Sequence, residues 1–205
     1  MENQDKKKEL IIDAALKRFA HFGLSKTTMT EIANDLSLSK ALLYYYFPDK
    51  ISLYCAVLGS IISSMDKELK RGTASSGNSQ EALALFLQKR GDFISKYYNL
   101  LDFTKITGTD LPEELTSMFR KAKQSEIGII TAILEKGVRT GELQVSDPQQ
   151  TALLLMDALG GIVFNELKTH ARPFFPEKEQ FDIILKRQQK LGQIFLNGLK
   201  HWQEA

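Results

Sequence analysis

Apolar residues recur three or four positions apart along almost the whole chain, which is the spacing of one face of a helix. In the first segment this pattern places Leu10, Ala14, Ala15, Phe19 and Phe22 on one stripe. No alternation typical of strands stands out. Glycines and prolines divide the pattern into helices expected over residues 6–22, 28–36, 39–47, 48–71, 80–107, 112–140, 148–171 and 176–202. We therefore expect an all-α protein.

The helix ends are marked by local signals near the N-terminus. Gly23 suits a C-terminal cap because glycine accepts the left-handed conformation. Thr28 and Glu31 have the spacing of a capping box, and Ser39 is a good N-cap for the following helix. Pro48 ends that helix and can occupy the first position of the next one.

The helices expected over 28–36 and 39–47 are short, and only Ser37 and Leu38 separate them, as in a helix-turn-helix. Ala33 is small where the helices would cross, and apolar side chains such as Leu43 can fill the space between them. The second helix of such a motif lies in the major groove of DNA. Its exposed positions would carry a cation and phenol hydroxyls, from Lys40, Tyr44 and Tyr45.

The run Thr27-Thr28-Met29-Thr30-Glu31-Ile32-Ala33, followed by Leu38-Ser39-Lys40-Ala41-Leu42-Leu43-Tyr44-Tyr45-Tyr46-Phe47-Pro48-Asp49-Lys50, resembles the DNA-binding domain of TetR-type transcriptional regulators. The resemblance covers about residues 5–65. It implies contacts to phosphates or bases at Thr28, Thr30, Ser39, Lys40, Tyr44, Tyr45 and Lys50. The sequence departs from the family pattern at the turn residue Ser37, at Ala41-Leu42 and at Tyr46, which leaves the base preference open.

Each of these features has a plainer interpretation. A Leu-Leu-Tyr-Tyr-Tyr-Phe run in isolation is more often a buried helix, and lone lysines are usually solvated. Here the flanking residues occur at the positions that a helix-turn-helix requires, so the DNA-binding interpretation is favoured over the buried helix. The cluster Lys6-Lys7-Lys8 is better explained as a solvated helix start, with a phosphate contact secondary. Cys55 is expected to be a small hydrophobe, and the spacing of Glu166 and His170 is a coincidence, so no metal site or cofactor is expected.

The C-terminal part offers candidates for a dimer interface. The segments 152–167 and 181–202 are apolar on more than one face, which suits a twofold four-helix interface as well as an intrachain core. The resemblance implies the same homodimer. The candidate interface residues are Leu155, Leu159, Gly160, Val163, Ile184, Leu191, Phe195 and Trp202. Such a dimer would place two recognition helices about 34–36 Å apart, to match a palindromic site.

The middle of the chain mixes aromatic and polar residues that could line a cavity for a small-molecule effector. These candidates are Phe93, Tyr97, Tyr98, Asp102, Phe103, Thr107, Met118 and Phe119. An aromatic stripe is more often core than pocket. If a ligand binds, it would change the separation of the two DNA-binding heads, with the helix expected over 48–71 as the lever.

Composition narrows the remaining classes. The chain has 205 residues, a net charge of +2, 43% hydrophobic residues and one cysteine, which is ordinary globular composition without intrachain disulfides. The charged start is unlike a signal peptide and the most apolar stretch is too broken to cross a bilayer, so a cytoplasmic protein is expected. The first 50 residues carry only +1. Useful DNA affinity would then require a dimer.

Two domains are expected, a DNA-binding head over 5–65 and a dimerising, ligand-binding body over 66–205. The favoured function is a sequence-specific regulator, more often a repressor, that leaves its operator when an effector binds. The alternatives are a helical interaction protein that kept the head fold, and an all-α enzyme. The enzyme is disfavoured because the sequence shows no nucleophile–base constellation, metal cluster or phosphate loop.

Overall fold

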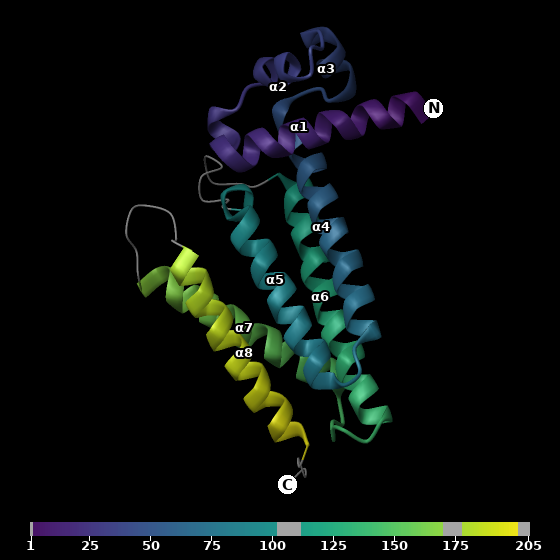
Figure 1. The fold of residues 1–205 in the computed structure, drawn as a ribbon, viewed down its shortest axis with the longest axis vertical. Coiled ribbons are helices and arrows are strands. Elements are labelled where there is room, and N and C mark those ends of the chain that lie inside the picture. The colour runs from purple at the N-terminus through teal and green to yellow at the C-terminus, as the bar shows by residue number, and fades with distance from the viewer. Residues whose placement is uncertain (1, 102–111, 170–177, 201–205) are drawn as a thin grey trace. The chain divides into compact units, whose positions relative to one another are not determined.

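The computed structural model describes residues 2–101, 112–169 and 178–200, and all regular structure in these ranges is helical (Figure 1). Eight helices occur in this described part: α1 (Glu2–Lys26), α2 (Met29–Asp35), α3 (Lys40–Tyr46), α4 (Lys50–Ser75), α5 (Ser79–Leu101), α6 (Glu113–Arg139), α7 (Pro148–Thr169) and α8 (Lys178–Leu199). Each corresponds to one helix expected from the sequence. The all-α fold class is confirmed.

Several helix ends differ from the expectation. Gly23 does interrupt α1, with φ 77°, but a further turn follows it. Helix α4 starts at Lys50, because Asp49 caps it by accepting the Ser52 N–H at 2.7 Å. Gly72 does not end α4. It lies inside the helix, where an added Cβ would come within 2.9 Å of the Leu85 side chain, so close packing explains this glycine.

The chain divides into two compact units, and the first comprises Met1–Ser64 and Tyr97–Arg120. Its core forms around Tyr54, whose ring packs edge-on against Phe19 with centroids 5.4 Å apart. The buried Tyr54 hydroxyl donates a hydrogen bond to the Leu100 carbonyl. The backbone leaves helical geometry at Tyr97, at the boundary between the units. The expected division between residues 65 and 66 stays a prediction about independently folding domains.

The expected apolar stripe of α1 is displaced by one residue at its start. Leu10 and Phe22 are 58% and 48% exposed, whereas Ile11, Ala15 and Phe19 are fully buried. The buried residues are spaced by four, so they lie on one narrow face of the helix. This face packs into the core of the first unit and positions α1 beside α2.

The second unit comprises Met65–Lys96 and Lys121–Ala205. Its buried residues come from five helices and include Leu69, Phe86, Ile130, Leu155, Leu159 and Leu196. Helices α7 and α8 pack together, and the buried Gln188 amide of α8 donates to the Leu159 carbonyl of α7 at 3.0 Å. In the described ranges, no helix is long and apolar enough to span a membrane.

The structure corrects part of the expected dimer surface. Leu155 and Leu159 are each 1% exposed and Ile184 is 7% exposed, so these three side chains belong to the intrachain core and cannot reach a partner. Gly160 is exposed, while Val163, Leu191 and Phe195 are half-buried. Trp202 lies outside the described residues. The large apolar side chains exposed on α7 and α8 are instead Leu154, Phe164, Ile183 and Ile194.

Candidate nucleic-acid interface

Helices α2 and α3 are joined by a tight turn with Ser37 at its centre. The Leu38 N–H donates to the Ala33 carbonyl at 2.9 Å, and the Ser37 N–H donates to the Asn34 carbonyl at 3.0 Å. This pair of bonds is a Schellman motif, which needs a left-handed residue at the position of Ser37. Ser37 adopts φ 53° and is the described part's one non-glycine residue with positive φ. The departure from the family pattern at Ser37 therefore still gives a tight turn, with a serine at a position that favours glycine.

Helix α3 has one buried face and one outward face. Leu43 is fully buried and Phe47 is 4% exposed, so both anchor the helix to the first unit. On the outward face Tyr44 is 41% and Tyr45 69% exposed. The Lys40 ammonium lies 5.9 Å from the centre of the Tyr44 ring. The expected cation and phenol groups thus share the surface of α3.

The N-caps of α2 and α3 form as expected, and they differ in what they leave free. The Thr28 hydroxyl accepts the Glu31 N–H at 3.2 Å and donates to the Glu31 carboxylate at 2.7 Å. Ser39 Oγ accepts the Leu42 N–H at 3.2 Å and, among the described residues, donates to nothing. The Thr28 hydroxyl therefore already donates a hydrogen bond, whereas the Ser39 hydroxyl can still donate one at the start of α3. Thr30 is exposed beside them.

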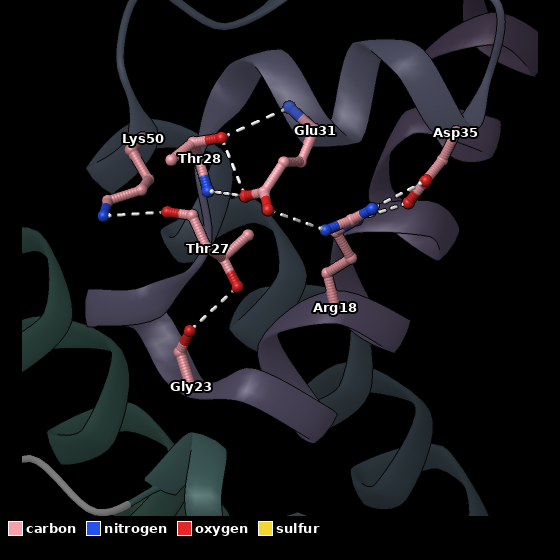
Figure 2. A network of polar contacts seen from close by, with 7 residues as sticks. All are labelled: Arg18, Gly23, Thr27, Thr28, Glu31, Asp35 and Lys50. Atoms are coloured by element: carbon pink, nitrogen blue, oxygen red, sulfur yellow. Dashed lines mark hydrogen bonds and ion pairs between the residues drawn. The ribbon is translucent and has the colours of Figure 1, made fainter.

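An ion-pair network joins α1 to α2 (Figure 2). The Arg18 guanidinium reaches the Asp35 carboxylate through both Nη2, at 2.8 Å, and Nε, and it lies 3.3 Å from Glu31. The hydrogen bond from Arg18 lowers the pKa of Asp35. Hydrogen bonds from Thr28 lower the pKa of Glu31. These contacts hold α2 at a fixed angle to α1, which sequence reasoning missed because the partners are 13 and 17 residues apart.

Lys50 has a structural role in this structure. Its ammonium donates to the Thr27 carbonyl at 3.0 Å (Figure 2). It also donates to the Leu24 carbonyl at 2.8 Å. Thr27 is fully buried, and its hydroxyl donates to the Gly23 carbonyl at 2.9 Å. A helix end leaves carbonyls without helical partners, and Lys50 satisfies two such groups after the kink of α1. Because an ammonium has three N–H donors, one remains for the phosphate contact expected for Lys50, which stays a prediction.

The N-terminal turns of α1 contact α3, which the sequence did not indicate. The Gln4 amide donates to the Tyr45 hydroxyl at 3.0 Å, and the Lys8 ammonium lies 5.7 Å from the centre of the Phe47 ring. These contacts arise because α1 begins at Glu2, about one turn before the expected start. Lys8 is exposed as well as near the Phe47 ring, so the interpretation of the Lys6-Lys7-Lys8 cluster as a solvated helix start stays a prediction.

The candidate effector residues are only partly described. Tyr97, Tyr98, Met118 and Phe119 are half-buried in the first unit, and Phe93 is half-buried in the second. Asp102, Phe103 and Thr107 lie outside the described residues. Met118 packs in the first unit close to Gly59 of α4, 3.6 Å from where a Cβ would stand. The pocket stays a prediction.

Other reactive groups in the described ranges give no competing site. Cys55 is 1% exposed, and burial together with nearby Glu114 raises the pKa of its thiol to about 11. A neutral buried thiol behaves as a small hydrophobe. Within the described residues, no group of three or more His, Cys, Asp or Glu side chains could hold a metal ion.

Comparisons with known proteins agree with this geometry. Residues 11–57 match the family model described as bacterial regulatory proteins, tetR family. The HTH-type transcriptional regulator RutR of Escherichia coli O157:H7 is 31% identical over 153 residues, which cover 73% of this chain and 70% of RutR. A transcriptional regulator from Cytophaga hutchinsonii superposes with a TM-score of 0.84 at 32% identity, covering 95% of this chain and 99% of that one.

The fold is also shared with a more distant protein. FadR of Bacillus subtilis, solved in complex with stearoyl-CoA, superposes with a TM-score of 0.65 at 17% identity, over 93% of this chain and 98% of FadR. The helix-turn-helix with its outward-facing α3, the family match and the relatives above 30% identity lead to one conclusion. The chain belongs to the TetR family of bacterial regulators and is a DNA-binding transcriptional regulator.

Proposed function

We propose that this regulator is a homodimeric repressor that binds a palindromic operator in the bacterial cytoplasm and is released by a small-molecule effector. The observation that carries the DNA-binding part is the outward face of α3, where Tyr44 and Tyr45 are exposed beside Lys40 while Leu43 and Phe47 are buried. A helix held in this way can enter the major groove without disturbing its own core.

The proposed contacts fall into two groups. Lys40, Tyr44 and Tyr45 reach bases or phosphates from α3, and Ser39 and Thr30 offer hydroxyls beside it. Thr28 and Lys50, whose polar groups already have partners inside the first unit, act by holding the motif in shape. We therefore narrow the DNA-contacting set to the first five residues.

Dimerisation is proposed through α7 and α8. Leu154, Phe164, Ile183 and Ile194 are between 40% and 65% exposed on these two helices. An exposed set of large apolar side chains on adjacent helices is typical of a protein–protein interface. Gly160, Val163, Leu191 and Phe195 complete the proposed surface. Two subunits related by a twofold axis would present two copies of α3 to successive major grooves.

The effector would bind among Tyr97, Tyr98 and Phe119, the half-buried aromatic candidates of the first unit. The fold shared with FadR, which was solved with stearoyl-CoA, supports a small molecule without indicating its identity. A thermal-shift screen of lipophilic, aromatic and acyl compounds tests this part, because a ligand that binds the native state raises its melting temperature. A flat screen would contradict the sensing pocket but not the DNA-binding role.

Operator binding is tested by fluorescence anisotropy with duplexes from the gene's own upstream region. We expect Lys40→Ala and Tyr44→Ala each to weaken binding by about tenfold or more, since one good contact contributes about 1–3 kcal/mol. Lys67→Ala, at an exposed lysine of α4, is the matched control and should bind as the parent does. Unchanged binding by folded Lys40→Ala and Tyr44→Ala proteins at moderate salt would refute the assignment of α3.

A further inference from the structure

A groove of about 680 Å³ lies in the second unit between the last turns of α4 and the second half of α6. It is lined from α4 by Lys70, Thr73 and Ala74, and from α6 by residues that extend from Ser125 to Arg139. At 1.5 Å per residue, this stretch of α6 is about 20 Å long. None of the proposed DNA, dimer or effector residues lines the groove. Its function is therefore a separate question.

The middle of the groove is apolar and open. Ile129 and Ile133 are each 4% exposed and form its floor. Gly128 and Ala132, one helical turn apart, are both exposed, and a Cβ added at Gly128 would meet nothing within 4 Å. These two small residues leave space that longer side chains would fill. The result is an elongated apolar trough on an otherwise polar helix face.

One end of the groove carries positive charge. The Lys136 ammonium donates to the Ser76 carbonyl at 2.7 Å and lies 3.4 Å from that of Ala74, which holds it in place at the groove wall. Arg139 follows one turn-length later in the last turn of α6. Neither cation forms an ion pair with a described carboxylate. The pKa of the nearby Glu142 carboxylate is lowered by the hydrogen bond that it accepts from the Ser79 N–H, at 2.8 Å, and also by the charge of Lys136, so this end carries two cations and one anion.

The other end is electrically balanced. Lys70 pairs with Asp66 at 2.8 Å, and Asp66 also accepts a hydrogen bond from Ser125. Burial acts to raise the pKa of Asp66, but the hydrogen bonds from Lys70 and Ser125 together with the charge of Lys70 outweigh it and lower the pKa. The two ends of the groove thus differ in charge. The end at Asp66 and Lys70 is neutral, the middle is apolar, and the other end carries the cations Lys136 and Arg139.

We propose that this groove binds a small amphipathic anion, with its apolar body over Gly128 and Ala132 and its acidic headgroup at Lys136 and Arg139. The charge complementarity selects an anion over a cation, and the apolar floor selects a molecule with a hydrocarbon or aromatic body over a bare inorganic ion. Hydrocarbon burial would supply most of the affinity and the cations the orientation.

The experiment uses the full chain and two probes of equal length and opposite charge, 1-octanesulfonate and octylammonium. Calorimetry gives the affinities, and spectra of isotope-labelled isoleucine δ1 methyl groups locate the site. We expect octanesulfonate to shift the Ile129 and Ile133 signals in a saturable way. Octylammonium should bind this site at least about tenfold more weakly. Equal binding of the two probes, or no saturable shift of these signals, would overturn the proposal.

Two variants and two matched controls make the assignment specific. Ala132→Leu fills the trough from an exposed helical position and should abolish the shifts. Arg139→Gln should weaken octanesulfonate by about threefold to fivefold, as expected for a partly exposed charge pair. Ala84→Leu on α5 and Lys121→Gln on α6 change exposed residues outside the groove and should bind as the parent does. Unchanged binding by Ala132→Leu would refute the site, whatever the outcome of the operator experiments.

Discussion

At the scale of single residues, Ser37 shows how a sequence can meet a geometric requirement with an imperfect residue. The Schellman motif at the end of α2 requires a left-handed residue, and Ser37 supplies it with φ 53°. The left-handed conformation costs an L residue about 1–2 kcal/mol, a strain that is absent in glycine. The turn that aims α3 outward therefore lowers the stability of the fold.

We expect Ser37→Gly to stabilise the protein by about 0.5–1 kcal/mol, because the relief of strain exceeds the extra entropy that glycine loses on folding. Urea denaturation followed by circular dichroism measures the change. Ser60→Gly, at an exposed helical position of α4, is the control and should instead destabilise by about 0.5 kcal/mol. A loss of stability in Ser37→Gly would show that the serine contributes something beyond its backbone conformation.

Lys40 and Lys50 illustrate two different uses of the same side chain. Lys50→Met removes the donor to two carbonyls, and we expect the free energy of unfolding to fall by about 1.5–3 kcal/mol. Lys40→Met should leave that free energy unchanged. It should instead reduce the slope of log K against log salt by about 0.9 for every phosphate that the lysine neutralises in the parent complex.

Urea denaturation and operator titrations between about 50 and 200 mM salt separate these outcomes. If Lys50→Met lowered the salt slope at unchanged stability, Lys50 would contact DNA and its bonds to Leu24 and Thr27 would not stabilise the fold.

At the scale of elements, the sequence predicted what is encoded locally. The eight helices of the described ranges and the caps at Thr28 and Ser39 were predicted because each signal lies within four residues of its effect. The sequence predicted that Leu10 lies on the buried face of α1, whereas its neighbour Ile11 is buried instead. Packing against Tyr54 of α4 determines which face of α1 is buried.

Contacts between residues distant in sequence also explain why the roles of some candidate site residues were not predicted. Lys50 satisfies carbonyls 23 and 26 residues away, so its role could not be read from its neighbours. Leu154 and Leu155 are adjacent and chemically identical, but one is 65% and the other 1% exposed. Only the packing of α7 on α8 distinguishes them. Residue type predicted the outward Tyr44 and Lys40, because the capped ends of a short helix fix its register.

The ion-pair network that joins α1 to α2 predicts how the stability of the protein depends on pH. The pKa values of Asp35 and Glu31 are lowered in the folded state, so the unfolded chain takes up protons first as the pH falls. The stabilisation is complete above the ordinary carboxyl pKa of about 4 and is lost as the pH falls below it. We expect Asp35→Asn to melt at a lower temperature than the parent at neutral pH, with the difference shrinking as the pH approaches about 3.

Melting curves over this pH range provide the measurement. Asp13→Asn, on the exposed side of α1, serves as the control and should differ from the parent by a constant amount. A melting difference for Asp35→Asn that stays the same at every pH would mean that Arg18 does not stabilise this carboxylate.

At the scale of the whole molecule, the exposed apolar side chains of α7 and α8 predict the state of assembly. Leu154 and Ile194 are 65% and 59% exposed, and both line a hollow of about 330 Å³ between these helices. We expect the double variant Leu154→Glu with Ile194→Glu to be monomeric at micromolar concentration, because burying two charges at a twofold interface is costly. Operator affinity should fall by about a hundredfold or more once the two heads bind separately.

Sedimentation equilibrium measures the assembly and anisotropy the operator binding. Val138→Glu on α6 is the control, since Val138 is 38% exposed but lies on another helix. A double variant that remained dimeric would place the interface elsewhere on the chain.

The division of the chain into two units limits how such regulators can be recombined. A transplant that stopped at residue 64 would carry the whole helix-turn-helix but leave out Tyr97–Arg120. The buried hydroxyl of Tyr54 would then lack the Leu100 carbonyl, and the apolar surface that Leu100 and Leu115 normally cover would be open to water. A chimera that exchanges DNA specificity therefore needs three splice points, within α4, α5 and α6, rather than one. The kink at Tyr97 marks where the second of them belongs.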